Sequence, residues 1–268
     1  MRKLIKRIRF IIVMLAVLVV GGAVAVALLA DKAVQTAVEK AGTKTLNVGV
    51  KVGKAHAGIL QGTVDLQNIT VANPAGFQGV ALLTLQRVNI AADTRSLLSS
   101  QVHIKDMRLA NMEVFVEQKV LQNNLYDVIK PLRQPGKPTG KSLLIDNLEI
   151  ANITVHASLS GIPGKPQTAQ FTLGNITMTD IGRNEKVDTA VLIGKILLAV
   201  AAGVAQQGGD ILPNETLGEI TGILDKAIDI GKIIFGPAGK TPDGWQQDSL
   251  GKSVTEGIKD LLSGKKKQ

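Results

Sequence analysis

A ten-residue pattern that occurs four times in the middle of the chain restricts the fold more than any other feature. In each copy, apolar residues occupy places 1, 3, 6 and 8, and Asn or Asp occupies places 5 and 10; the copies are residues 64–73, 102–111, 143–152 and 171–180. Places 1 and 3 are two residues apart, as are places 6 and 8, and two is the side-chain period of a β-strand. The pattern therefore predicts a β-rich domain.

The step from place 3 to place 6 is odd, so the apolar side of a regular strand would leave the core there. A bulge or a tight corner restores the phase, and Asn and Asp suit such places because they tolerate the left-handed conformation. We therefore predict strands of about five residues, joined by bulges or corners in one strongly curved sheet. Further strands are expected over residues 46–52 and 82–91, and a short helix over residues 121–132.

Residues 10–30 contain no charged side chain. A helix of that length covers about 31 Å, which matches a hydrocarbon core of roughly 30 Å. Five basic residues precede this segment, so the positive-inside rule places residues 1–9 in the cytoplasm and the rest of the chain outside. We expect a transmembrane anchor, followed by a stalk helix over residues 31–45. A cleaved signal peptide is the alternative, although its apolar region is usually shorter.

The C-terminal third, residues 186–268, is predicted to be helical and to follow a β-domain over residues 46–185. Residues 187–205 are almost all apolar, interrupted mainly by Lys195, which favours a helix buried against the sheet over one that lies in a membrane or plugs a pore. One-sided apolar stripes over residues 217–234 and 250–261 predict two amphipathic helices packed on the sheet. The lysines at 265–267 are a solvated end or a site for lipid phosphates.

The sequence offers no catalytic residue, metal site or cofactor motif. It has no cysteine, its three histidines (His56, His103 and His156) lie about fifty residues apart, and Asp146 is an isolated acid. His103 and His156 lie between inward apolar neighbours and should point outward. The net charge of +9 comes mainly from five basic residues at the N-terminus and three at the C-terminus, which leaves the body nearly neutral. We therefore predict that the protein is not an enzyme and does not bind nucleic acid.

Several short segments occur in an order that is similar to one family. They are Ala-Val-Glu-Lys-Ala-Gly at 37–42, Gly62 to Asn73, Asn-Pro-Ala-Gly-Phe at 73–77 followed by an apolar strand, Ser-Leu-Leu-Ser at 96–99, residues 102–116, and Asn-Asn-Leu-Tyr at 123–126. Together they resemble the AsmA-like proteins of the bacterial envelope, over about residues 37–160. The resemblance implies a curved β-groove with an apolar inner face and a link to phospholipid transport and outer-membrane maintenance.

From these features we expect a bacterial inner-membrane protein, largely periplasmic, whose groove binds or helps to move lipid. Its partners would be the membrane, a phospholipid, and a second copy or another envelope protein. The residues expected to face lipid are Leu66, Ile69, Val71, Ile104, Met107, Leu109, Ile145, Leu148, Ile150, Leu173, Ile176 and Met178. The alternative is a structural scaffold of an envelope complex, in which helices close the same face into a filled core.

Overall fold

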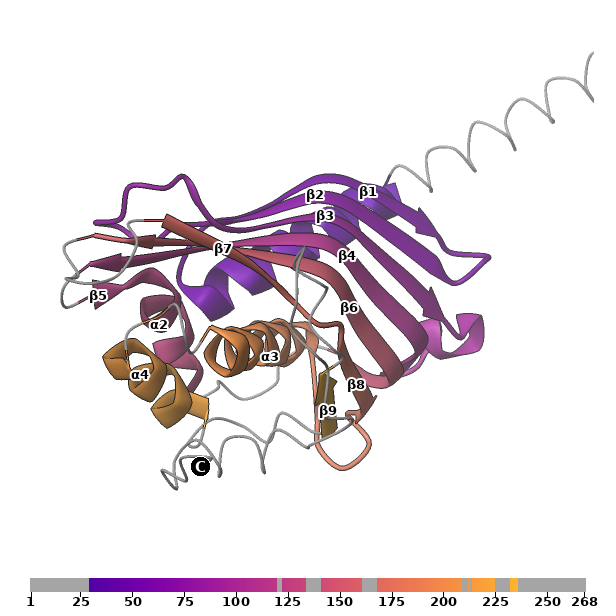
Figure 1. The fold of residues 1–268 in the computed structure, drawn as a ribbon. Helices are drawn as coiled ribbons and strands as arrows, with labels where there is room; N and C mark the ends of the chain where they lie inside the picture. The colour runs from indigo at the N-terminus through magenta and orange to yellow at the C-terminus, as the bar shows by residue number, and fades with distance from the viewer. Residues whose placement is uncertain are drawn as a thin grey trace, which may run out of the picture.

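A computed structural model describes residues 29–119, 122–133, 141–160, 168–208, 212, 214–224 and 232–235. Residues 1–9, nearly all of the expected anchor and the helix expected over residues 250–261 lie outside the described residues. The described chain is mostly β, as the repeat predicts. A curved mixed sheet arches over helices that lie together on its inner side (Figure 1).

The sheet has nine strands in the described chain, in the order β1-β2-β3-β4-β6-β8-β9, with β5 paired to β4 and β7 paired to β6. The strands are β1 (Val50–Gly58), β2 (Thr63–Ala72), β3 (Ala81–Ala92), β4 (Gln101–Lys119), β5 (Gln122–Asn123), β6 (Ser142–Leu159), β7 (Thr168–Leu173), β8 (Ile176–Ile181) and β9 (Lys232–Phe235). Strands β4 and β6 are parallel, and the other pairs are antiparallel. The second and third copies of the repeat therefore lie side by side in register.

The phase changes of the repeat occur inside long strands, so the prediction of five-residue strands is wrong for β4 and β6, which have 19 and 18 residues. Asn68, Asn111 and Asn152 adopt the left-handed conformation, with φ of 55°, 58° and 55°. At the level of these asparagines, one residue on each strand is left out of the regular pairing. Because both partners of every pair of strands leave out one residue there, the register on either side is unchanged. The skipped residues form a row across five strands, which we call the crease: Gly53, Asn68, Gln86, Asn111 and Asn152.

The crease is where the sheet keeps its apolar side toward one core. The side chain of Asn152 donates to Asn111 Oδ1 (3.1 Å), and that of Asn111 donates to Gln86 Oε1 (3.0 Å). In the fourth copy the break is complete, because β7 ends before Gly174 and β8 starts after Asn175, while both strands pair with β6. Only this copy has the short strands that the sequence predicts for all four.

Replacing Asn152 should separate the energetic cost of its left-handed backbone from the contribution of its side-chain hydrogen bond. The left-handed conformation costs a branched side chain about 1–2 kcal/mol, and glycine does not incur this cost. Asn152→Val is therefore expected to lower the free energy of unfolding by about that amount relative to Asn152→Gly, as measured by chemical denaturation. Both variants lose the hydrogen bond to Asn111, so the difference reports the backbone alone. Equal stability of the two variants would contradict this interpretation.

Residues 29–46 form a helical segment that is docked on the domain, where the sequence suggests a stalk. Its side chains bind backbone groups of the edge strand β1. Glu39 accepts from Val52 N (2.9 Å), Gln35 donates to Val52 O (2.7 Å), Asp31 accepts from Ala57 N (2.6 Å) and Thr43 accepts from Val50 N (3.0 Å). These bonds satisfy groups that an exposed edge would leave open to another strand. The expected strand over residues 46–52 starts only at Val50, because the helix continues to Leu46.

The other helices are α2 (Asn124–Ile129), which continues as the 3-10 turn η2 (Lys130–Arg133), α3 (Thr189–Gln207) and α4 (Asn214–Leu224). Asp188 caps α3 by accepting from Val191 N (3.0 Å). Among the described residues, α3 is the one helix long and apolar enough to cross a membrane, and 72% of its most apolar stretch is buried inside the protein. The helix expected over residues 217–234 is confirmed as far as Leu224 and is wrong at its described end, because Lys232–Phe235 pairs with β8 as a strand.

Candidate functional surfaces

The structure places all twelve residues expected to face lipid in one buried cluster. Each of them has 8% or less of its surface exposed, and five of them, including Ile145, Leu148 and Ile150, have none. The same cluster contains Leu198, Val200 and other residues of α3. The repeat therefore identifies the correct face of the sheet. In the described part of the chain, that face is filled by helices and forms a core.

The cover over the inner face is itself aliphatic, with one exception. Helix α3 supplies buried Leu, Val and Ala along most of its length. Lys195 lies in the middle of it with 1% of its side chain exposed, and its Nζ is 2.6 Å from Glu185 Oε1. Glu185, in the turn before α3, keeps 37% of its side chain exposed, so the ion pair connects the core to the surface.

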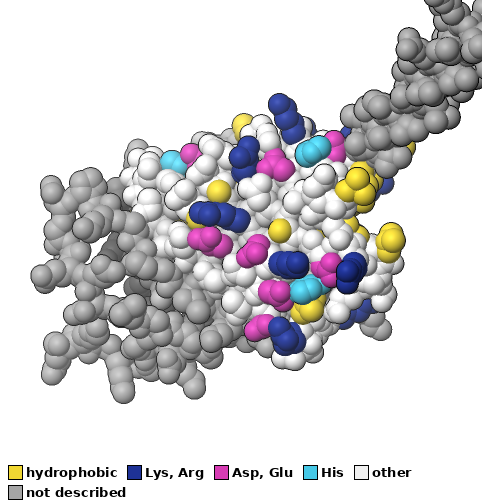
Figure 2. Space-filling model, turned by 90° about the vertical axis from the view of Figure 1, so that its right-hand side faces the viewer, with side chains coloured by type: hydrophobic (Ala, Val, Ile, Leu, Met, Phe, Trp, Pro, Cys, Tyr) yellow, Lys and Arg dark blue, Asp and Glu magenta, His cyan; other side chains and the backbone are white. Residues whose placement is uncertain are grey.

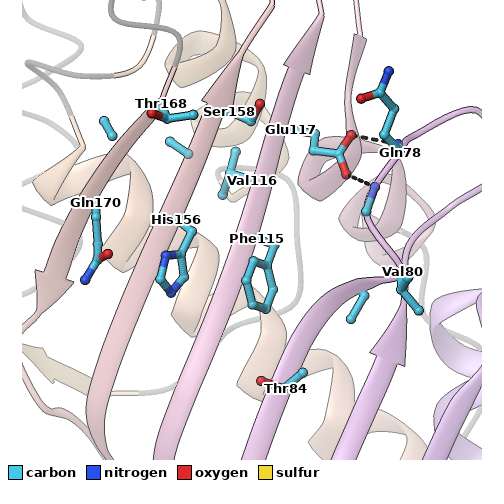
Figure 3. A pocket seen from close by; sticks show the side chains of 14 residues that line it. Gln78, Val80, Thr84, Phe115, Val116, Glu117, His156, Ser158, Thr168 and Gln170 are labelled. Carbon is cyan, nitrogen blue, oxygen red and sulfur yellow. Dashed lines mark hydrogen bonds between the residues drawn. The ribbon is translucent and has the colours of Figure 1, made fainter.

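A trough of about 790 Å³ lies on the outer face of the sheet (Figure 3). The rings of Phe115 and His156, on β4 and β6, are stacked on its floor with centroids 5.0 Å apart and planes 12° apart. Gln170 of β7 lies on one side and the loop at Gln78 on the other (Figure 3). The Nε2 atom of His156 is buried and has no hydrogen-bond partner among the described residues; Glu113 Oε1 is 4.0 Å away.

One wall of the trough is held by a hydrogen-bonded node at Glu117. Its carboxylate accepts from Gln78 N (2.8 Å), Gly79 N (2.6 Å) and Asn73 Nδ2 (2.6 Å). The fully buried Asn124 donates to Asn73 Oδ1 (2.9 Å) and to Phe115 O (2.7 Å). The Asn-Pro-Ala-Gly-Phe and Asn-Asn-Leu-Tyr segments, which are separate parts of the resemblance described above, thus meet in space. Their first structural role is to fix the loop after β2 against β4.

A second polar pair lies on the outer face at the other end of the same strands. His103 Nε2 is 2.7 Å from Asp146 Oδ2, so Asp146 is not the isolated acid that the sequence suggests. Both side chains are partly exposed, as expected for outward-facing positions. Ser96 lies nearby, but its Oγ accepts from the backbone N–H of His103 (2.9 Å) and donates to Asp93 O (2.6 Å), as a turn residue does. The described residues contain no group of three or more potential metal ligands.

Comparison of the chain with protein-family models, with curated proteins and with solved structures finds no match. The likeness to AsmA-like proteins therefore stays a prediction that rests on the segments named above. The function is argued below from the filled inner face and the outer trough.

Proposed function

We propose that the chain is a membrane-anchored, non-enzymatic interaction module of the bacterial envelope, with a closed β-domain held on the periplasmic side of the inner membrane. The observation that supports this proposal is the burial of every residue expected to face lipid, to 8% exposure or less. A face buried to this extent stabilises the fold and leaves no exposed surface for a ligand. The surfaces left for recognition are those on the outside of the sheet.

The trough suits a segment of a partner protein. Its stacked Phe115 and His156 offer apolar ring surface, and Gln78 and Gln170 at its sides bring amide donors and acceptors. A volume of about 790 Å³ is large enough for a few side chains. The Glu117 node holds one wall in place before a partner arrives, which lowers the ordering cost of binding.

Lipid transport is the second candidate, and a specific observation favours it. The inner face is aliphatic across the sheet, and α3 above it is aliphatic nearly all round. If α3 moved away, acyl chains would meet a surface worth about 25 cal/mol per Å² buried. This candidate agrees with the resemblance to AsmA-like proteins, and it requires the cover to open.

A reversible lock on α3 separates the two candidates. A Cβ atom at Gly194 would lie 3.9 Å from Thr45 Cγ2, close enough to attempt a disulfide between Gly194→Cys and Thr45→Cys, and the natural chain has no cysteine to interfere. For a closed module, we expect no uptake of fluorescent phospholipid by the purified protein, oxidised or reduced. Uptake by the reduced protein that is lost on oxidation would establish the lipid function. The single-cysteine variants serve as controls for the substitutions.

A separate experiment in cells tests the trough. A photocrosslinking amino acid at Gln170, in cells, should form a discrete adduct with an envelope protein, and Phe115→Ala should reduce its yield. The matched control carries the crosslinker at Arg108, which is exposed on the outer face of β4 but is not part of the trough. Equal adduct patterns from the two positions would argue against a partner site in the trough.

A further inference from the structure

Most of the exposed large aliphatic side chains lie at one end of the domain. Five large hydrophobic residues are exposed in the described chain: Leu29 (71%), Ile59 (48%), Leu60 (89%), Val80 (91%) and Leu98 (94%). Ile59 and Leu60 form the turn between β1 and β2, and Leu98 ends the 3-10 turn η1 (Thr94–Leu98) between β3 and β4. Tight turns normally carry Gly, Asn, Asp or Ser, so large aliphatic side chains at this exposure are unusual.

The two turns are neighbours. Ala92 N donates to Gly62 O (2.7 Å), and Gly62 has a φ of +67°. A Cβ atom at Gly62 would lie 2.3 Å from Ala92 O and 3.0 Å from Thr94 Cγ2, so glycine is required for this approach. The apolar tips at 59–60 and at 98 therefore project from one edge of the domain, which we call the rim. Figure 2, which views the right-hand side of Figure 1, shows exposed hydrophobic side chains on this face, several of them toward its right-hand edge.

The chain enters the domain at the rim. Asp31 accepts from Ala57 N (2.6 Å), two residues before Ile59, and its carboxylate is 3.6 Å from His56. The helical segment that carries Asp31 begins, in the described chain, at the exposed Leu29. Residues 10–30, which carry no charge, end at this point of the sequence. A bilayer spanned by that segment would lie next to the rim.

The basic side chains at the rim also suit contact with a bilayer. Within 58–62 and 93–101 the charged residues are Arg95 and Asp93, and Asp93 caps η1 by accepting from Arg95 N (3.1 Å). Lys141 adds a second positive charge, and its Nζ donates to Leu97 O (2.8 Å). Basic side chains beside exposed aliphatic ones are the usual composition of surfaces that bind the interface of anionic membranes.

We propose that the rim inserts into the lipid interface of the bilayer that anchors the chain, with Ile59, Leu60 and Leu98 among the acyl chains and Arg95 and Lys141 at anionic headgroups. This inference rests on the proposed anchoring. The domain then stands on the membrane, with the β4 and β6 strands leading away from it. Phe115 lies fourteen residues beyond Gln101 on β4, which is about 45 Å of strand, so the trough faces away from the bilayer.

The test uses the whole chain, reconstituted in vesicles of phosphatidylcholine and phosphatidylglycerol. Because the natural sequence lacks cysteine, Leu60→Cys, Leu98→Cys or Val80→Cys can each carry a single environment-sensitive fluorophore. Val80 is the matched control, because it is as exposed as Leu60 but lies at the opposite end of β3 from the rim. Val80 directly precedes β3, and η1 comes after the far end of that strand. We expect blue-shifted emission and several-fold stronger quenching by spin-labelled lipid at positions 60 and 98 than at 80. Adding Arg95→Gln and Lys141→Gln should reduce the quenching at 60 and 98.

The outcomes that overturn the inference differ from those that overturn the anchoring. Water-like emission at all three positions, in a chain that resists carbonate extraction, refutes the rim and leaves the anchored module intact. Extraction of the chain by carbonate refutes the anchor as well. A blue shift at 60 and 98 that depends on protein density and not on lipid quencher refutes membrane insertion and assigns the rim to a second copy.

Discussion

A chain that ends after Lys186 is expected to lose its folded β-domain. It would lack α3, α4 and β9, and would expose much of a face that now has 8% or less exposure at each of twelve aliphatic positions. Burial of one such side chain contributes about 1.5–3 kcal/mol, so exposing even half of them would cost about 9–18 kcal/mol. That loss matches or exceeds the whole stability of a typical domain, about 5–15 kcal/mol.

Circular dichroism and limited proteolysis in mild detergent would measure this loss. We expect the truncated chain to lack a cooperative unfolding transition and to be digested rapidly. The matched control ends after Phe235 and keeps every described element, so it should retain the transition. A truncated chain that stays folded and takes up phospholipid would instead show that the C-terminal helices cap an open groove.

The second large effect is expected at the buried ion pair of α3. Glu185→Gln removes the carboxylate that lies 2.6 Å from Lys195 Nζ. A hydrogen bond to a charged group contributes about 1.5–3 kcal/mol, so the variant should lose about this much unfolding free energy. In a Lys195→Met background the same substitution should cost less than about 0.5 kcal/mol, because the charge that needs the carboxylate is gone.

Urea denaturation of the four proteins in this cycle gives the coupling energy directly. The pair of Arg183 and Asp180 is the matched control, because both side chains are more than half exposed although their atoms are also 2.6 Å apart. Arg183→Gln should change the stability by about 0–1 kcal/mol. Additive effects of the Glu185 and Lys195 substitutions would mean that the ion pair does not stabilise the fold.

The repeat predicts the sheet, its inner face and the conformation of several asparagines, because these depend on neighbours in the sequence. Asn111 and Asn152 are left-handed, as their place at a phase change suggests. The predicted strand lengths are wrong because, in a single sequence, a phase change looks like the end of a strand. In the folded sheet the strand continues through the phase change, because the neighbouring strands change phase at the same level. The second and third copies, 41 residues apart, form the parallel pair of β4 and β6, and the repeat alone does not give this direction of pairing.

The filling of the inner face and the trough depend on contacts between distant segments. An aliphatic strand face has the same sequence whether a helix or a lipid covers it, so Leu148 and Ile150 do not distinguish a core from a groove. The node at Glu117 joins Asn73 and Asn124, which are 51 residues apart, and the pattern of each segment alone gives no sign of it. The pairing of His103 with Asp146 likewise follows from a parallel register that only the fold supplies.

The docking of residues 29–46 on β1 has a mechanical consequence. Glu39, Gln35, Asp31 and Thr43 bind this helix to the strand at four points, so the described helical segment is held rigidly against β1. A flexible leader would let the domain swing freely and sample many orientations. Under the anchoring proposed above, a helix held in this way would fix the angle between the sheet and the bilayer, and a force on the anchor would pass into β1. The proposed anchored protein would then hold the far end of its sheet at a defined distance from the membrane.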